Sequence, residues 1–450
     1  MPYLFTQSGY NSEFKDSYAD FLKTVINNQW ILGKNFQVSD QSTLEAQMNN
    51  LYWSQYLDVW NNYIANIKVT PFSNLSAATQ NLGLLSKDNE SSIVRLLQVV
   101  SDNTSFTSDS STLSNNVISN AYSASNSLLI QPNKNTPAPI HTYIQAINNL
   151  YRYFVNIQQS AVPDQAAFQQ AKQLFSDSQT NPIKQLRILA LQAPEPLATW
   201  LNQIVRSSLI TIFNSANKYI ESQWDNSIKS RFNTAFKDSY PFTKTSNNNA
   251  SPDDFLNFIN KNGDMHAFFT KYLEAFIFAN KNYQAKSLYG VKFPINANIS
   301  KTLNNVKHLA DMFNLSKDSK VSFIIEPRAL SKNIRNISIN YGDNSFTYAY
   351  GPIFPYHWSW PLASLNQDLI IKAQLFSGTL KTYSFSGPWS LFKFLSQTDV
   401  KQISPTTYTV EYKDNGIDIS LTLTASSSLN PFKGTLTAAL SPLVRYIDLS

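Results

Sequence analysis

The spacing of apolar residues changes near Lys320, and this change restricts the folds open to the chain. Before Lys320, apolar side chains recur at steps of three and four residues, which is typical of amphipathic helices. After it, apolar and polar residues alternate in short runs separated by turn sequences such as Gly342-Asp343-Asn344 and Asp414-Asn415-Gly416. The sequence therefore predicts an α+β multidomain protein, with an N-terminal all-α helical bundle region followed by a C-terminal antiparallel β-sandwich.

Composition and turn signals divide the chain further, into three predicted domains. Residues 1–245 form a helical domain, residues 246–320 a helical connecting subdomain and residues 321–450 the sandwich. The first predicted helix spans 11–33 and ends at Gly33. Residues 101–139 are rich in Ser, Asn and Thr, which predicts a mobile loop. Residues 435–440 are predicted to be the final strand.

One apolar stretch lies among the predicted strands, at residues 387–395. Pro388 suits the first position of a helix, where its missing N–H costs nothing, and Gly387 suits the N-cap. Trp389 and Phe392 are three residues apart and widen the apolar face. We expect this short helix, the plug, to close one end of the sandwich core without any chemical role.

The residues that usually carry catalysis are scarce or badly spaced. The chain has no cysteine, which excludes disulfides, thiolate metal sites and cysteine nucleophiles. Its four histidines show no metal-ligand spacing, and neither a phosphate-binding loop nor a Gly-x-Ser-x-Gly motif occurs. Glu326 with Asp343 or Asp368 is a conceivable carboxylate pair, but the spacing does not favour it. We predict no catalytic residue, no cofactor and no metal.

Charge and hydropathy also limit the partners and the location. Net charge is +6, without a basic cluster interleaved with aromatic residues, so nucleic acid is not expected. No run reaches the roughly 18 apolar residues of a membrane span. Residues 1–6 lack the basic and apolar regions of a signal peptide. A role outside the cytoplasm would therefore need an export signal from elsewhere.

Aromatic residues concentrate between positions 348 and 360, among several prolines. Three interpretations stay open for them: packing in the sandwich core, a protein interface, or a platform for a glycan. The candidate interface residues are Tyr350, Phe354, Tyr356, Trp358 and Trp360.

Short motifs occur in a fixed order along nearly the whole chain. In the helical part their main residues are Phe5, Thr6, Gly9, Tyr10, Trp30, Tyr52, Tyr56 and Trp60. In the β part they are Tyr350-Gly351-Pro352, Trp360-Pro361, Gly387, Pro388, Trp389, Phe392, and Asn430-Pro431-Phe432. Together they resemble the C-terminal periplasmic region of the IcmF/TssM family. Three positions depart from the family pattern: Gln55 replaces an acid, Leu362 a glycine and Lys393 an arginine.

The resemblance implies a non-enzymatic periplasmic scaffold that stabilises and bridges an envelope-spanning secretion complex, within an inner-membrane protein whose membrane spans lie outside this chain. The Asn- and Ser-rich, Lys-over-Arg composition leads us to expect the type IVB (Dot/Icm) member IcmF, with type VI TssM as the alternative. Implied partners are a DotU/TssL-like inner-membrane protein, other secretion proteins including an outer-membrane lipoprotein, and further copies of the chain. Two other classes remain open: a peptidoglycan- or glycan-binding module and a secreted hydrolase.

Overall fold

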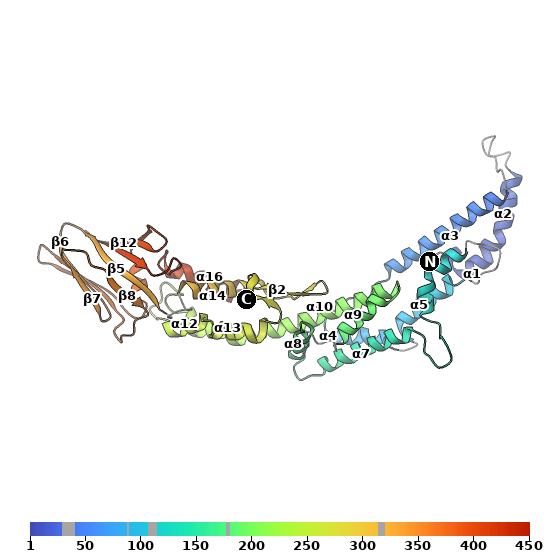
Figure 1. The fold of residues 1–450 in the computed structure, drawn as a ribbon, viewed down its shortest axis with the longest axis horizontal. Helices are drawn as coiled ribbons and strands as arrows, with labels where there is room; N and C mark the ends of the chain where they lie inside the picture. Colours follow the sequence, from blue (N-terminus) through green and yellow to red (C-terminus); the bar gives the residue numbers. More distant parts are fainter. Residues whose placement is uncertain (29–40, 88–89, 107–114, 177–180, 314–319) are drawn as a thin grey trace. The chain divides into compact units, whose positions relative to one another are not determined.

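The computed structural model describes residues 1–28, 41–87, 90–106, 115–176, 181–313 and 320–450 (Figure 1). The chain divides into two compact units, Met1–Ala216 with Leu288–Val291, and Asn217–Ser287 with Lys292–Ser450. The division falls within helix α10 (Leu197–Trp224). The domain boundaries predicted after residues 245 and 320 stay predictions.

The first unit is built from helices. After a turn of helix at Tyr3–Phe5 they are α1 (Gln7–Gly9), α2 (Lys15–Asn27), α3 (Gln41–Asn66), α4 (Leu75–Leu85), α5 (Ser92–Thr104), α6 (Asn115–Ser127), α7 (Ile140–Gln158), α8 (Pro163–Leu174), α9 (Pro182–Gln192) and the first part of α10. Side chains of Asn74, Ser91 and Asn181 accept backbone N–H groups at three helix starts, as good N-caps do. The predicted stop at Gly33 lies outside the described residues.

Helix α6 contradicts the prediction of a loop throughout 101–139. Its Ile118 and Tyr122 are four residues apart and lie in a core cluster with Tyr56 and Trp60 of α3. The many Ser and Asn residues of this helix hid the four-residue step from a judgement based on composition. Two buried apolar side chains suffice here because a large aromatic core already exists beside them.

The second unit begins with helical segments. They include π-helical turns at Asp225–Lys229, Asn233–Lys237 and Phe269–Leu273, and helices α12 (Pro252–Ile259), α13 (Asp264–Phe268) and α14 (Ala297–Met312). Ser251 caps α12 by accepting the N–H of Asp254. Four short strands that the sequence did not predict precede α14: β1 (Ile277–Phe278), β2 (Gln284–Ala285), β3 (Ser287–Leu288) and β4 (Val291–Lys292). Among the described residues, no helix combines the length and apolar character needed to cross a membrane.

Two antiparallel sheets form the sandwich, as predicted. One has the order β10 (Leu380–Phe385), β9 (Leu369–Leu375), β6 (Ile334–Tyr341), β7 (Asn344–Tyr348). The other has the order β11 (Asp399–Gln402), β12 (Thr407–Asp414), β13 (Ile417–Ala425), β5 (Val321–Leu330), β8 (Tyr356–Trp360). Rings from facing sheets touch, with centroids 5.3 Å apart for Tyr341 and Trp358 and 5.0 Å for Tyr383 and Tyr412.

The chain ends in a helix where a strand was predicted. Helix α16 (Leu436–Asp448) starts at Thr435, whose hydroxyl accepts the N–H of Ala438. Its buried side chains are spaced by four, three and four residues, which is a helical period: Leu436, Leu440, Leu443 and Ile447. The prediction over 435–440 was wrong because six residues are too few to separate the two periods. The alanines at 438 and 439 favour the helix.

Candidate partner surface at the free end of the sandwich

The plug lies inside the second unit, between the sandwich and the helices. Helix α15 (Ser390–Leu395) begins later than predicted, because Gly387 adopts a positive φ of 89° and Pro388 precedes the helix. Trp389 is fully buried and donates its indole N–H to the Ala250 carbonyl oxygen, 2.7 Å away. Its ring lies 4.6 Å from that of Trp360, whose N–H bonds the Pro388 carbonyl oxygen at 2.8 Å.

The Asn430-Pro431-Phe432 motif supports the plug from the other side. The side-chain oxygen of Asn430 accepts the N–H of Phe432 at 3.1 Å, which fixes the turn. Phe432 then packs on Phe392 of the plug and on Phe323 of β5, with centroids 6.2 and 5.2 Å away. These motif residues therefore hold the core together rather than face a ligand.

The motif residues of the first unit perform a similar task at the N-terminal segment. The Tyr52 hydroxyl donates to the Leu4 carbonyl oxygen at 2.7 Å, and the Trp60 indole N–H donates to the Phe5 carbonyl oxygen at 2.9 Å. Thr6 accepts the N–H of Gly9, where a Cβ would lie only 1.9 Å from the Tyr3 carbonyl oxygen. Segment 3–10 is thus tied to α3.

Two further motif residues of the first unit, Tyr10 and Tyr56, also make contacts around α3. The ring of Tyr10 lies 4.9 Å from that of Trp53. Tyr56 donates its hydroxyl to the Asn103 carbonyl oxygen at 2.6 Å, and burial raises its pKa, so the hydroxyl remains a donor. Trp30 lies outside the described residues.

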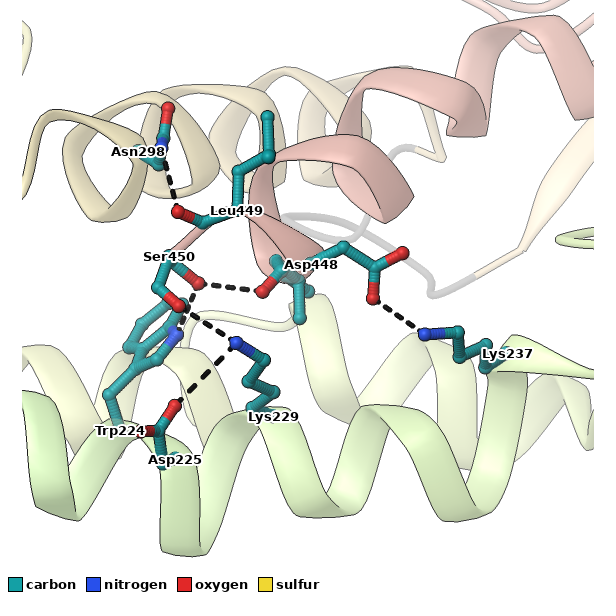
Figure 2. A network of polar contacts seen from close by, with 9 residues as sticks. Trp224, Asp225, Lys229, Lys237, Asn298, Asp448, Leu449 and Ser450 are labelled. Carbon is teal, nitrogen blue, oxygen red and sulfur yellow. Dashed lines mark hydrogen bonds and ion pairs between the residues drawn. The ribbon is translucent and has the colours of Figure 1, made fainter.

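Helix α16 fastens the sandwich to the helices a second time, and we call its polar contacts the brace (Figure 2). It packs along α14, and Asn298 of α14 donates to the Leu449 carbonyl oxygen at 2.9 Å. Asp448 pairs with Lys237 at 2.8 Å. The last residue of the chain meets the end of α10 and the following turn: the Ser450 hydroxyl accepts the indole N–H of Trp224 at 2.7 Å, and its carbonyl oxygen accepts Lys229 at 2.9 Å.

The candidate interface residues separate into two groups. Trp358 and Trp360 are buried, at 4% and 0% exposure, so their assignment to an interface was wrong. They lie two residues apart on β8 and point to the same, inner face. Tyr356 is half-buried and stacks on Phe346, with centroids 4.4 Å apart. Tyr350 and Phe354 are exposed, at 50% and 58%.

Tyr350 and Phe354 belong to a larger apolar group at the end of the sandwich away from the plug. Its hydrogen bonds join three loops. The Tyr350 hydroxyl donates to the Ile334 carbonyl oxygen at 2.7 Å, and the Phe376 N–H donates to the Asn333 carbonyl oxygen at 3.0 Å. The exposed apolar members, which we call the tip, are Tyr350, Ile353, Phe354, Phe376 and Leu380. Sequence reasoning missed Ile353, Phe376 and Leu380, although an apolar residue beside the Ser377-Gly378 turn was a usable signal.

One of the carboxylates considered for chemistry, Asp368, has a structural contact. Asp368 accepts the N–H of Gly387 at 2.8 Å and so supports the plug. Among the described residues, no three histidine or carboxylate side chains gather in a way that would hold a metal ion. The strongest candidate for a functional surface in the sandwich is therefore the tip.

Comparison with known proteins gives the family. A model of the IcmF-related family, described as "Intracellular multiplication and human macrophage-killing", matches residues 1–105. The type VI secretion protein IcmF helical domain matches residues 215–318, and the type VI secretion protein IcmF C2-like domain matches residues 323–427. The chain belongs to the IcmF/TssM family. The IcmF C2-like domain thus coincides with most of the sandwich.

Relatives of known identity point to the type VI branch of the IcmF/TssM family. The chain is 23% identical over 484 residues to the type VI secretion system component TssM1 of Pseudomonas aeruginosa. That alignment covers 97% of the chain and 43% of TssM1, so the chain spans less than half of this curated relative. The comparisons favour TssM over the Dot/Icm protein that the composition suggested. Lys-over-Arg usage follows the base composition of a genome and cannot identify a secretion system.

Two solved structures share the fold. A chain of a type VI secretion system membrane core complex aligns with a TM-score of 0.75 and 14% identity, over 98% of this chain and 88% of that chain. A chain of a type VI membrane complex aligns with a TM-score of 0.68 and 14% identity, over 90% and 79% of the two chains. At this identity the likeness is one of fold alone.

Proposed function

We propose that this chain is a non-enzymatic periplasmic scaffold region of a TssM protein in a type VI secretion membrane core, and that it bridges the inner-membrane part toward the outer membrane. Membership of the IcmF/TssM family supports the general role. The observation that carries the proposal is the tip, an exposed apolar group on a sandwich that the plug and the brace fasten to the helices of its own unit.

The tip has the chemistry of a protein contact. Five large apolar side chains, each at least half exposed, lie in residues 350–354 and 376–380, and both segments hydrogen-bond to residues 331–334. Groups of exposed apolar residues often mark interaction sites in soluble domains, and aromatic residues dominate binding energy at such sites. We assign the tip to an outer-membrane lipoprotein of the complex. We propose two further partners for other surfaces of the molecule. They are a DotU/TssL-like inner-membrane protein and further copies of this chain.

The test is co-purification of the full-length protein from cells that express the whole secretion system. The double variant Phe354→Asp/Phe376→Asp places two charges in the tip, and Leu365→Asp is the matched control on a fully exposed leucine outside it. We expect the double variant to lose the lipoprotein and keep the inner-membrane partner, with an unchanged melting temperature. Undiminished lipoprotein recovery would overturn the assignment of the tip.

The same purification tests which secretion system the protein belongs to. A binding assay on peptidoglycan tests whether the protein binds a glycan instead of a lipoprotein. A type VI scaffold should bring down type VI baseplate and lipoprotein components, whereas recovery of Dot proteins would reverse the choice between the two systems. Retention of the isolated protein on peptidoglycan sacculi, abolished by the double variant, would replace the lipoprotein by a glycan as the ligand of the tip.

A further inference from the structure

A second concave site lies in the helical part of the second unit, away from the tip, plug and brace. It is a cavity of about 290 Å³ between the α12–α13 segment and α14. Its floor is apolar and belongs to well-packed side chains that are each at most 9% exposed: Ile259, Met265, Phe269, Leu303 and Val306. Because these residues are fixed in the core, the cavity is preformed, as most small-molecule sites are.

The rim of this cavity carries a different chemistry. Lys261 stands on the α12–α13 side and Lys307 on the α14 side, and both are exposed. In the described part of the chain, neither lysine has a carboxylate within ion-pair distance, although other lysines such as Lys229 and Lys237 do. His266 adds a further polar group to the α13 side of the rim.

Tyr283 and Asp311 also line the cavity, as does the uncharged Asn260. The ring of Tyr283 contacts Phe269 edge-on, with centroids 5.5 Å apart. Burial and then the Asp311 carboxylate raise the pKa of Tyr283, so its hydroxyl stays protonated. Tyr283 and the preceding Asn282 both have positive φ, 53° and 50°, a conformation that costs energy in residues other than glycine and often occurs at functional sites. With two lysines against one aspartate, the rim carries excess positive charge.

We propose that this cavity binds an anionic amphiphile, with its hydrocarbon chain on the apolar floor and its negative head group between Lys261 and Lys307. Burying a hydrocarbon chain against the floor is favourable at about 25 cal/mol per Å² of apolar surface. The unpaired lysines decide the sign of the head group. This inference is independent of the proposed function of the tip, since the two sites share no residue.

Calorimetric titration of the 450-residue chain with three 12-carbon amphiphiles, each below its critical micelle concentration, tests the proposal. Laurate represents a free fatty acid, lauroyl-lysophosphatidylglycerol a membrane lipid, and dodecyltrimethylammonium carries the opposite charge. We expect at least one anionic compound to bind about tenfold more tightly than the cationic one. The anionic compound that binds more tightly shows whether the natural ligand is a free fatty acid or a membrane lipid. Equal affinity for all three overturns the proposal.

Two variants place the binding in this cavity. Lys261→Gln/Lys307→Gln removes the rim charges without touching the core and should weaken binding of the anionic compound about tenfold. Ala310→Trp fills the cavity from α14 and should abolish it. Lys244→Gln, at an exposed lysine outside the cavity, is the matched control and should bind like the wild type. Undiminished binding by the double glutamine variant overturns the assignment, whatever the tryptophan variant does.

Discussion

The indole N–H of Trp389 donates a 2.7 Å hydrogen bond to the main-chain carbonyl oxygen of Ala250, which lies two residues before α12. This one contact joins the plug of the sandwich to the segment that leads into α12. Trp389 also touches Phe255 of α12, with ring centroids 6.0 Å apart. The plug therefore closes the core and also fastens the sandwich to its helices.

Replacing Trp389 should destabilise the second unit in two steps. Trp389→Phe keeps most of the ring but leaves the Ala250 carbonyl oxygen without its donor, which should cost about 1–3 kcal/mol. Trp389→Ala also creates a cavity, so its cost should be about 3–5 kcal/mol. Urea unfolding followed by circular dichroism measures both. Phe354→Ala, at the exposed tip, should leave the transition unchanged, and an equal effect of all three variants would contradict the role of the plug.

A pair of glycine variants separates backbone strain from steric clash. Gly387 and Gly378 have nearly the same φ, 89° and 88°, but a Cβ on Gly387 would lie 2.7 Å from the Asn249 side chain while one on Gly378 would meet nothing within 4 Å. Both alanine variants should lose about 1 kcal/mol or more through the left-handed conformation. Gly387→Ala should lower the melting temperature further, and equal melting temperatures would show that Asn249 moves away freely.

Tyr56 should matter to the first unit through its hydroxyl. Tyr56→Phe removes the hydroxyl that donates to the Asn103 carbonyl oxygen at a partly buried position, at a cost of about 1 kcal/mol. Tyr63, on the same helix and 38% exposed, is the matched control, and Tyr63→Phe should change the unfolding free energy by less than about 0.5 kcal/mol. Identical denaturation curves for the two variants would contradict the anchoring of α5 on α3 through this hydroxyl.

High pH should destabilise the first unit through its buried tyrosines. Burial raises the pKa of Tyr122 to about 12, whereas an unfolded tyrosine ionises near pH 10. Between these values the folded state binds more protons than the unfolded state, so stability is complete below about pH 10 and falls as the pH rises toward 12. Melting temperatures measured across this range should fall less steeply in Tyr122→Phe than in the wild type. Parallel curves would rule out a contribution from Tyr122.

The periodicity of the sequence predicted the two fold classes and the sandwich, because each strand carries its own alternation of buried and exposed residues. The same rule, applied to β8, separates Trp358 and Trp360 from the exposed aromatic residues, since both occupy the inner face. Treating residues 348–360 as one aromatic group discarded that information. Helix α6 was missed for a related reason, because composition took precedence over the four-residue step from Ile118 to Tyr122.

The tip could not be predicted in the same way. Residues 350–354 and 376–380 meet the turn at 331–333 only because of the strand order across two sheets, which local patterns do not encode. The cavity beside α14 is similar, since Lys261 and Lys307 are 46 positions apart in the printed sequence and share a rim only after packing. Sequence motifs identified residues that hold the core, and the exposed surfaces depend on topology.

Helix α16 has a mechanical consequence. The chain enters the sandwich after α14 and returns along α14 through α16, whose end is bonded to Trp224, Lys229 and Asn298. A pull on the tip is therefore resisted by the packing and polar contacts of α16 and by the buried Trp389 joint, in addition to the covalent chain that joins α14 to the sandwich. Load shared in this way strains each contact less than load on a single attachment, and both the α16 contacts and the Trp389 joint must break before the sandwich can separate from its helices.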